Sequence, residues 1–106
     1  MASWIPLAAL MTALLLLPAG AAGIGPKQAE KLEHLVRQDC GSCHGLTLKG
    51  GLGRPIDRDR MRQYDREVLR DIILDGVPGT AMPPWRPLIS ENEAQWIADY
   101  LREQRQ

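Results

Sequence analysis

Two cysteines and a histidine stand together in the sequence Cys40-Gly41-Ser42-Cys43-His44. This C-x-x-C-H spacing places two thiols on one turn, where both can attach covalently to the vinyl groups of a haem. The histidine that follows is carried beneath the ring, where an imidazole nitrogen can ligate the iron. The chain of 106 residues has no other cysteine. The pattern therefore predicts a c-type haem with His44 as an axial ligand.

Three other uses of the cysteine pair compete with this interpretation. A Cys40–Cys43 disulfide would add little stability, because the entropic gain grows with the length of the closed loop. A thioredoxin-like redox pair needs a βαβ context, which the downstream sequence does not suggest. A structural zinc site needs four ligands, and only His34 is left to supply the fourth. We therefore favour the haem.

The N-terminus has the composition of an export signal. Residues 5–17 are almost continuously apolar, and the small residues 19–22 suit cleavage. The apolar stretch is shorter than the roughly 20 residues that a membrane-spanning helix needs. No Lys or Arg precedes Lys27, so the usual positive start is missing and an uncleaved anchor stays open. We predict a signal peptide over residues 1–22 and a periplasmic domain over residues 23–106.

The composition of this domain favours a core built around a cofactor. The chain has no Phe, and the domain's aromatic residues are Tyr64, Trp85, Trp96 and Tyr100. A chain of this size buries a modest core and often needs a metal, disulfide or cofactor for stability. Thirteen basic residues balance thirteen acidic ones, so the overall charge does not indicate a nucleic-acid partner.

The first half of the domain is expected to form one helix and one long loop. Pro26 suits the first position of a helix that runs to Asp39. Leu32 and Val36 share one face of it, which leads toward the cysteine pair. Residues 45–64 are rich in Gly and show no sustained period. A loop of that length is uncommon unless it has something to wrap, such as one edge of a haem.

The second half is expected to form two more helices. Asp65 caps a helix over residues 66–74, and Gly76 ends it. Residues 77–89 form a second loop, and the capping box of residues 90–93 opens a last helix that runs to about Gln104. The expected inward faces are Val68, Leu69, Ile72 and Ile73 in one helix and Ala94, Ile97, Ala98 and Leu101 in the other. No strand is predicted, so the fold class is all-α.

Met82 is the expected second axial ligand. It lies in the sequence Gly79-Thr80-Ala81-Met82-Pro83-Pro84-Trp85, where two prolines stiffen the backbone as a weak Fe–S bond requires. A thioether is a soft ligand that raises the reduction potential. Most Met residues simply fill cores, and that alternative stays open for Met82. Met61, between two arginines, and His34, on another face of the first helix, are expected to be solvated.

These features together resemble the small monohaem class I cytochromes c. The resemblance rests on C-x-x-C-H after a short helix, a Gly–Pro loop, a Met-Pro loop and a C-terminal helix, and it covers the whole domain. Residues 39–48, 50–53 and 78–85 also resemble the NirC type, which is found with the cytochrome cd-type nitrite reductase of denitrifying bacteria. The resemblance implies three short helices and two long loops wrapped around one covalent haem.

The resemblance also implies roles for single residues. Cys40 and Cys43 would hold the haem, with His44 as the proximal ligand and Met82 as the distal one. Pro55 is similar to a loop proline whose carbonyl accepts the histidine's N–H, a bond that would fix the tautomer.

Other implied features concern packing. Trp85 could donate its indole N–H to a haem propionate or pack beside the ligand loop. The first and last helices of the family cross, and we place Leu32, Val36, Ile97 and Leu101 at this crossing. Many members have Gly where Leu32 stands, so a wider crossing is expected.

The expected function is one-electron transfer, because six strong ligands leave the iron no open site for a substrate. We expect a carrier, not an enzyme, that donates to dissimilatory nitrite reductase in denitrification. The alternative is an accessory role in maturing the reductase's haem d cofactor. A gas sensor would require Met82 to detach easily. We expect no nucleic-acid partner and no small-molecule substrate. A membrane contact is expected only if the signal segment is not cleaved.

A carrier needs a small, weak interface around its exposed haem edge. The candidates for that surface are Lys49, Arg54, Arg86, Leu46, Leu48 and Leu52. The arginines between Arg54 and Arg70 alternate with Asp57, Asp59, Asp65 and Glu67. We interpret that stretch as a solvated face with nearly cancelled charge.

Overall fold

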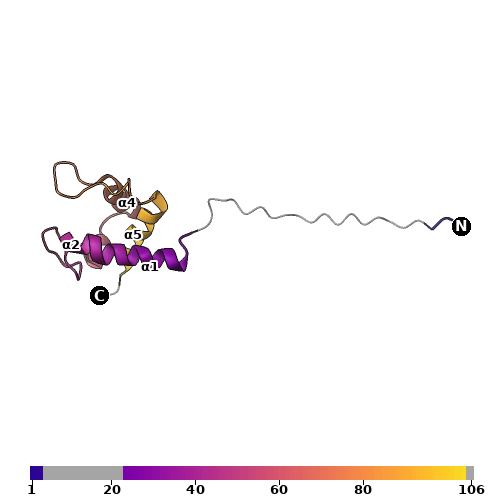
Figure 1. Cartoon of the computed structure of the whole chain (residues 1–106), viewed down its shortest axis with the longest axis horizontal. Helices are drawn as coiled ribbons and strands as arrows, with labels where there is room; N and C mark the ends of the chain where they lie inside the picture. Colours follow the sequence, from indigo (N-terminus) through magenta and orange to yellow (C-terminus); the bar gives the residue numbers. More distant parts are fainter. Residues whose placement is uncertain (4–22, 105–106) are drawn as a thin grey trace.

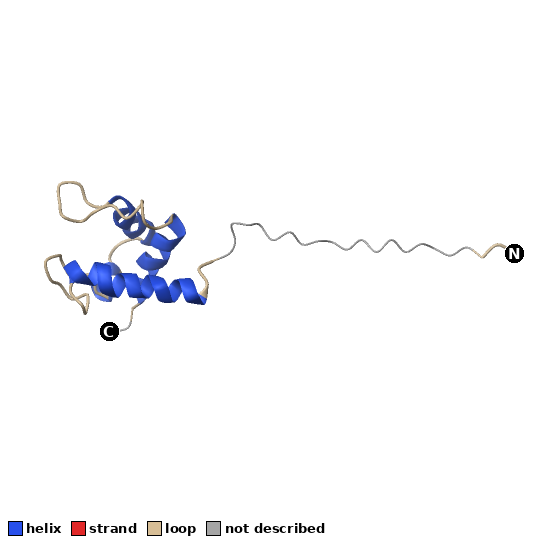
Figure 2. Cartoon of the chain, viewed as in Figure 1, coloured by secondary structure: helices blue, strands red, loops and turns tan. Residues whose placement is uncertain are grey.

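The computed structural model describes residues 1–3 and 23–104. The predicted signal peptide thus lies almost wholly outside the described residues. Across the described part of the chain the secondary structure is helical and contains no strand, which confirms the all-α prediction (Figure 2). No helix found there has both the length and the apolar character needed to cross a membrane.

The first helical segment is longer than predicted. Helix α1 (Pro26–Leu35) continues through a π-helical turn, η1 (Val36–Cys40), into α2 (Gly41–His44), as the purple-to-magenta rod of Figure 1 shows. A π turn holds an extra residue, so it rotates the cysteine pair relative to the apolar face of α1; such turns are frequent at functional sites. Gly45, with φ of 92°, ends the segment.

A single helical turn, α3 (Arg58–Met61), interrupts the first predicted loop. It turns Met61 into the core, where this side chain is only 5% exposed. The expectation that Met61 is solvated was therefore wrong. Its charged neighbours Arg60 and Arg62 remain exposed, because one helical turn sends adjacent side chains in different directions.

Helix α4 (Arg66–Asp75) begins after Asp65 as predicted, although the Asp65 side chain makes no capping hydrogen bond. Gly76, with φ of 66°, ends the helix. The buried side chains are Leu69, Ile73 and Leu74, whereas Val68 is 46% exposed. Val68 was thus wrongly assigned to the inward face, which extends instead to the end of the helix at Leu74.

Helix α5 (Glu91–Glu103) opens with the predicted capping box. Ser90 Oγ accepts from the Glu93 N–H at 3.1 Å, and the Glu93 carboxylate accepts from the Ser90 N–H at 2.9 Å. The four predicted inward residues, Ala94, Ile97, Ala98 and Leu101, are all buried.

The core lies where α5 packs against α4, α3 and α1. Leu32 and Val36 of α1 join Ile97 and Leu101 of α5 in one buried cluster, so the residues chosen for the helix crossing lie in the core. The other members of the cluster are Leu48, Ile56, Met61, Leu69, Ile73, Leu74, Ile89, Ala94 and Ala98. This frame holds the two loops that follow α2 and α4, and both extend from the same end of the domain in Figure 1.

Candidate haem site

The imidazole of His44 is held by a backbone carbonyl. His44 ends α2 and is half-buried, with its Nδ1 2.6 Å from the carbonyl oxygen of Arg54. A carbonyl can only accept, so Nδ1 must carry the proton and donate it in this bond. The lone pair is therefore on Nε2, which is free to ligate a metal.

The acceptor is the carbonyl of Arg54, and the prediction that it belongs to Pro55 was wrong by one residue. The reason is the close passage of the loop across the ring. A Cβ built on Gly53 would lie only 3.0 Å from both Cε1 and Nδ1 of His44. The next carbonyl along the chain, that of Arg54, therefore lies within hydrogen-bonding distance of Nδ1. The ring of Pro55 instead packs on Gly50, where a Cβ would lie 3.2 Å from Pro55 Cγ.

Backbone bonds fix the loop on the C-x-x-C-H turn. The N–H of Gly53 donates to the Cys43 carbonyl at 2.6 Å, and the N–H of Gly50 donates to the His44 carbonyl at 2.8 Å. These bonds satisfy carbonyls that the end of a helix leaves without partners. A Cβ on Gly51 would lie 2.8 Å from the Cys43 oxygen, so the close approach requires glycine.

The two cysteines do not form a disulfide and have different surroundings. Cys43 is exposed and Cys40 half-buried. Burial, followed by the nearby charge of Asp39, raises the pKa of the Cys40 thiol to about 11. A raised pKa is the opposite of the lowered pKa that activates the nucleophile of a redox-active C-x-x-C pair.

The donor set fits a haem better than an ion held by protein ligands alone. Within residues 1–3 and 23–104, no group of three or more His, Cys, Asp or Glu side chains could hold a metal ion. A porphyrin brings its own four nitrogens, so it needs only axial ligands from the protein. Cys40 and Cys43 at thioether spacing, followed by His44 with Nε2 free, could hold that group.

Met82 lies in a loop that is closed on itself. The Val77 N–H donates to the Met82 carbonyl at 3.2 Å. The Thr80 hydroxyl donates to the Val77 carbonyl at 2.7 Å and accepts from the Met82 N–H at 3.3 Å. At Gly76 a Cβ would lie 2.6 Å from the Met82 oxygen, so only glycine fits. The result is a half-buried methionine in a stiff loop.

The limb of this loop that follows Met82 runs along the end of α4. The Trp85 N–H donates to the Ile73 carbonyl at 3.1 Å, and the Arg86 N–H donates to the Leu74 carbonyl at 3.0 Å. Trp85 is half-buried against the core cluster. This anchoring fixes the position of Trp85 within the loop of residues 77–89, here called the methionine loop.

One of the six residues expected around a haem edge is placed differently, and a second is exposed as expected but paired with acidic residues. Leu48 is buried, with 5% exposure, and its carbonyl accepts from the Ile56 N–H at 2.9 Å, so it belongs to the core. The guanidinium of Arg86 forms ion pairs with Asp75 at 2.8 Å and Glu91 at 3.4 Å. Leu46, Lys49, Leu52 and Arg54 are exposed as expected.

The arginine-rich stretch forms several ion pairs at the surface, but Asp57, which was expected to be solvated, is buried with 8% exposure. The pairs are Arg58–Asp59, Arg60–Asp57, Arg66–Asp99 and Arg70–Asp71. This pairing agrees with the expected cancellation of charge, and the other three acidic residues of the stretch are exposed as expected. Asp99 on α5 was not foreseen as a partner, because no local spacing links it to Arg66.

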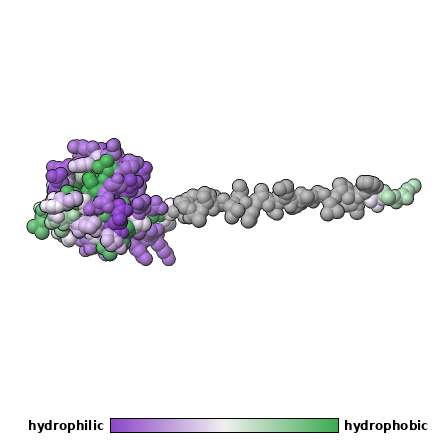
Figure 3. Space-filling model, turned by 90° about the horizontal axis from the view of Figure 1, so that it is seen from above, coloured by the Kyte–Doolittle hydropathy of each residue, from purple (hydrophilic) through white to green (hydrophobic). Residues whose placement is uncertain are grey.

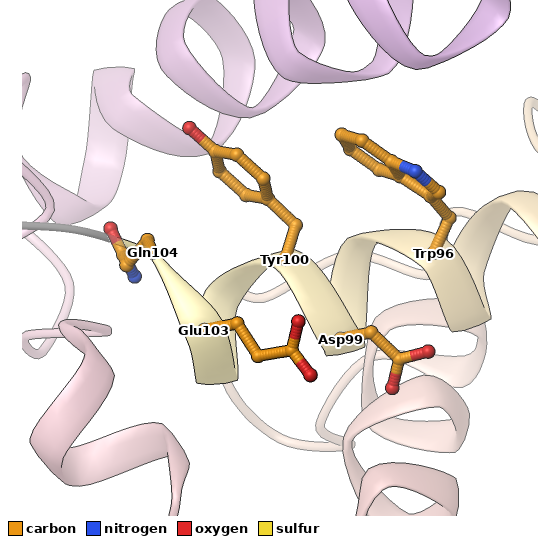
Figure 4. Close-up of a pocket in the computed structure, with 5 residues that line it drawn as sticks. All are labelled: Trp96, Asp99, Tyr100, Glu103 and Gln104. Carbon is orange, nitrogen blue, oxygen red and sulfur yellow. The ribbon is translucent and has the colours of Figure 1, made fainter. Parts of the chain in front are cut away.

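A surface hollow of about 350 Å³ lies elsewhere, on α5. Figure 4 shows the rings of Trp96 and Tyr100 standing together on one side of the helix, with Asp99 and Glu103 along another. The rings stack with centroids 5.2 Å apart. The Tyr100 hydroxyl lies 3.3 Å from a Glu33 carboxylate oxygen. The contacts join α5 to α1, and the hollow has no lining residue from the His44 or Met82 loops.

Sequence reasoning missed three groups that orient the site. These are the Arg54 carbonyl, the Gly53 backbone against the imidazole, and the Thr80 hydroxyl in the methionine loop. The dense glycines between residues 45 and 53 were the available signal, since they indicate close backbone approach without naming the partner atoms.

Comparison with known proteins agrees with this geometry. The family model described as cytochrome c oxidase, cbb3-type, subunit III, matches residues 27–101. Cytochrome c55X of Paracoccus denitrificans (strain Pd 1222) is 62% identical over 91 residues, which cover 83% of this chain and 88% of the relative. Cytochrome c55X of Stutzerimonas stutzeri is 40% identical over 94 residues, which cover 88% of this chain and 83% of the relative.

Two solved structures are also similar. The c-type cytochrome NirC aligns with a TM-score of 0.71 and 45% identity, over 74% of this chain and 92% of its own. Part of the dihydro-heme d1 dehydrogenase NirN, solved in complex with DHE, aligns with a TM-score of 0.62 and 30% identity, over 67% of this chain and 15% of its own. The chain therefore belongs to the small class I c-type cytochromes of the cytochrome c55X and NirC type, which carry haem c and transfer electrons instead of catalysing a reaction.

Proposed function

We propose that this chain is a periplasmic carrier of single electrons that bears one covalent haem and donates to dissimilatory nitrite reductase in denitrification. The observation that carries the proposal is the fixed imidazole of His44. Its Nδ1 is bound to the Arg54 carbonyl, and it directly follows two thiols at thioether spacing. That combination suits the proximal side of a haem.

Each site residue has a separate task in this proposal. Cys40 and Cys43 would form the two thioethers, so the cofactor cannot dissociate. His44 Nε2 would be the proximal ligand, and the Met82 sulfur the distal one. When bound, the haem supplies one-electron exchange between ferrous and ferric iron. The closed loop around Met82 would hold this weak ligand in place. A thioether ligand favours the ferrous state of the iron.

Pro55 and Trp85 would support the cofactor from outside the ligand set. Pro55 fixes the backbone after the Arg54 carbonyl, so the bond to His44 is presented in one geometry. Trp85, anchored to the end of α4, would donate its indole N–H to a haem propionate. Replacing Trp85 with Phe tests this: a propionate partner predicts an altered reduction potential, and a purely packing role predicts only lower stability.

Export follows from the composition of residues 1–22 and from the chemistry of c-type haem, which is attached outside the cytoplasmic membrane. We propose cleavage after residue 22. The intact mass of the protein purified from periplasm would give the N-terminus, and a full-length mass with membrane association would contradict cleavage.

The partner is proposed from the likeness to NirC and tested directly. The reduced protein is mixed with oxidised nitrite reductase of its own organism, and haem oxidation is followed by stopped flow. Fast, second-order oxidation that depends on salt supports direct donation. Slow or absent transfer by a protein with an intact His/Met spectrum rejects it.

A second function is favoured by the likeness to part of the dihydro-heme d1 dehydrogenase NirN. The chain would then exchange electrons during maturation of the reductase's haem d. A deletion strain separates the two functions. Nitrite reductase with its full haem d content but a slow electron supply indicates the donor role, whereas reductase that lacks haem d indicates the maturation role.

A further inference from the structure

We propose that the exposed surface of residues 46–54, made by Leu46, Lys49, Leu52 and Arg54, is the docking surface for an acidic patch on a partner redox protein, and that the methionine loop is not. This inference rests on the proposed carrier function. It goes further by choosing one of the two loops at the cofactor end of the domain and by stating the chemistry of the partner.

The apolar part of this surface is the most exposed in the described domain. Leu52 is 95% exposed and Leu46 is 76% exposed, and the two residues belong to the same short loop. Figure 3 shows that hydrophobic and hydrophilic side chains are mixed over the surface of the domain, with hydrophobic ones among those at the end that carries the two loops. Single exposed leucines are ordinary, but two in a loop fixed beside a cofactor site suggest an interface.

The charges differ between the two loops. Residues 45–54 contain Lys49 and Arg54 and no acidic residue. Arg54 accepts the hydrogen bond from His44 through its backbone carbonyl, not its side chain. The residue is exposed, and its guanidinium is not used in that bond. In the methionine loop, by contrast, the one cation is Arg86, and it pairs with Asp75 at the end of α4 and with Glu91 at the start of α5, which neutralise it. A positive rim around an apolar centre therefore exists on only one loop, and it is complementary to an acidic patch.

The loop is already fixed in shape. Its backbone is bonded to the C-x-x-C-H turn and to itself, including the Gly51 N–H to the Gly53 carbonyl at 3.0 Å and the Ile56 N–H to the Leu48 carbonyl at 2.9 Å. A fixed surface loses little conformational entropy on binding. It also touches the turn of Cys43, the exposed cysteine that would be one of the two attachment points of the haem. A partner docked here would lie beside that attachment point.

Apolar substitutions provide the first test. Electron transfer from the reduced holoprotein to oxidised nitrite reductase is measured by stopped flow for Leu52→Ser and for the matched control Leu88→Ser, which alters a 73% exposed leucine near the end of the methionine loop. We expect Leu52→Ser to lower the second-order rate constant about fivefold and Leu88→Ser to leave it within about twofold. Equal effects of the two changes would overturn the choice of loop.

Charge substitutions provide the second test. The double variant Lys49→Gln/Arg54→Gln is compared with Lys27→Gln, which lies near the far end of the helical rod, about 25 Å from His44 at 1.5 Å per residue. We expect the double variant to lower the rate constant about fivefold at low salt and to flatten its salt dependence, with the Lys27 control unchanged. An unchanged salt dependence in the double variant would contradict an acidic partner.

Two further measurements separate failure of the proposed donor function from failure of the proposed docking surface. If the wild-type protein transfers no electrons to nitrite reductase, the donor function fails. Oxidation by hexacyanoferrate(III) then tests the docking surface alone. This anion takes one electron from the ferrous protein. Lys49→Glu/Arg54→Glu must slow it more than Lys27→Glu does, or the inference fails. Binding of the wild type to anionic phosphatidylglycerol vesicles that Leu52→Ser abolishes, with electron transfer unaffected, would assign the surface to a membrane instead.

Discussion

Gly53 lies against the imidazole of His44 so closely that a Cβ there would be 3.0 Å from two ring atoms. We predict that Gly53→Ala turns or displaces the ring and lengthens the bond from Nδ1 to the Arg54 carbonyl. A weaker bond makes the imidazole a poorer electron donor, so the reduction potential should rise. Spectroelectrochemistry measures this, with Gly25→Ala, where nothing lies within 4 Å, as the control. An unchanged potential in Gly53→Ala would contradict the constraint.

Met82→Ala tests the distal ligand. The variant should keep its covalent haem, because the thioethers and His44 are untouched. It should lose the potential-raising thioether, so the potential falls, and the reduced protein should bind carbon monoxide at neutral pH. Met61→Leu is the control, because Met61 is a core residue with 5% exposure. If Met82→Ala keeps the wild-type potential, another group is the ligand.

Thr80 is predicted to hold Met82 in position. Its hydroxyl bridges the Val77 carbonyl and the Met82 N–H, and valine has the same shape without that hydroxyl. We expect Thr80→Val to increase carbon monoxide binding by the reduced protein, because the loop closes less firmly. Thr80→Ser should restore the wild-type behaviour. Equal binding by all three proteins would show that the hydroxyl does not restrain the ligand.

The capping box of α5 gives a prediction about stability. Ser90→Ala removes the acceptor for the Glu93 N–H and should lower the free energy of unfolding by about 1 kcal/mol. Chemical denaturation of the holoprotein, followed by circular dichroism, measures the change. Asn92→Ala, in the same first turn, is the control and should have a smaller effect. Loss of stability in the control alone would argue against the cap.

Acid should weaken the contact between α4 and α5. Hydrogen bonds from Arg66 hold the pKa of Asp99 below its ordinary value of 3.8. A carboxylate with a lowered folded-state pKa adds stability above its unfolded pKa, and this is lost as the pH falls below about 4. The effect is small because solvent screens a surface pair. Asp99→Asn should therefore flatten the acid limb of a stability–pH curve, unlike Asp71→Asn. Parallel curves for wild type and Asp99→Asn would reject this.

Several features could be predicted because they depend on neighbours in the chain. The C-x-x-C-H spacing acts within a single turn, and the Ser90–Glu93 capping box acts within four residues. Gly76 ends α4 because only glycine easily adopts its φ of 66°. In each case the chemistry is complete within a short segment, so residue types and spacing were enough.

Other features were decided by partners far along the chain. Met61 between two arginines looked solvated, yet a single helical turn against α5 buries it. Val68 and Leu48 were misplaced for the same reason, because burial depends on which neighbour covers a side chain. The Arg66–Asp99 pair joins residues 33 positions apart, a separation at which no sequence period operates.

The site itself divides in the same way. The sequence by itself determined which residues can bind a haem, because thiols, imidazole and thioether are recognisable by type and local spacing. Only the tertiary structure decided which carbonyl orients His44, since a one-residue difference in the path of a glycine-rich loop changes the acceptor from Pro55 to Arg54. It also decided that Arg86 is neutralised while Lys49 and Arg54 remain exposed, because the surroundings of a charge are set by the fold.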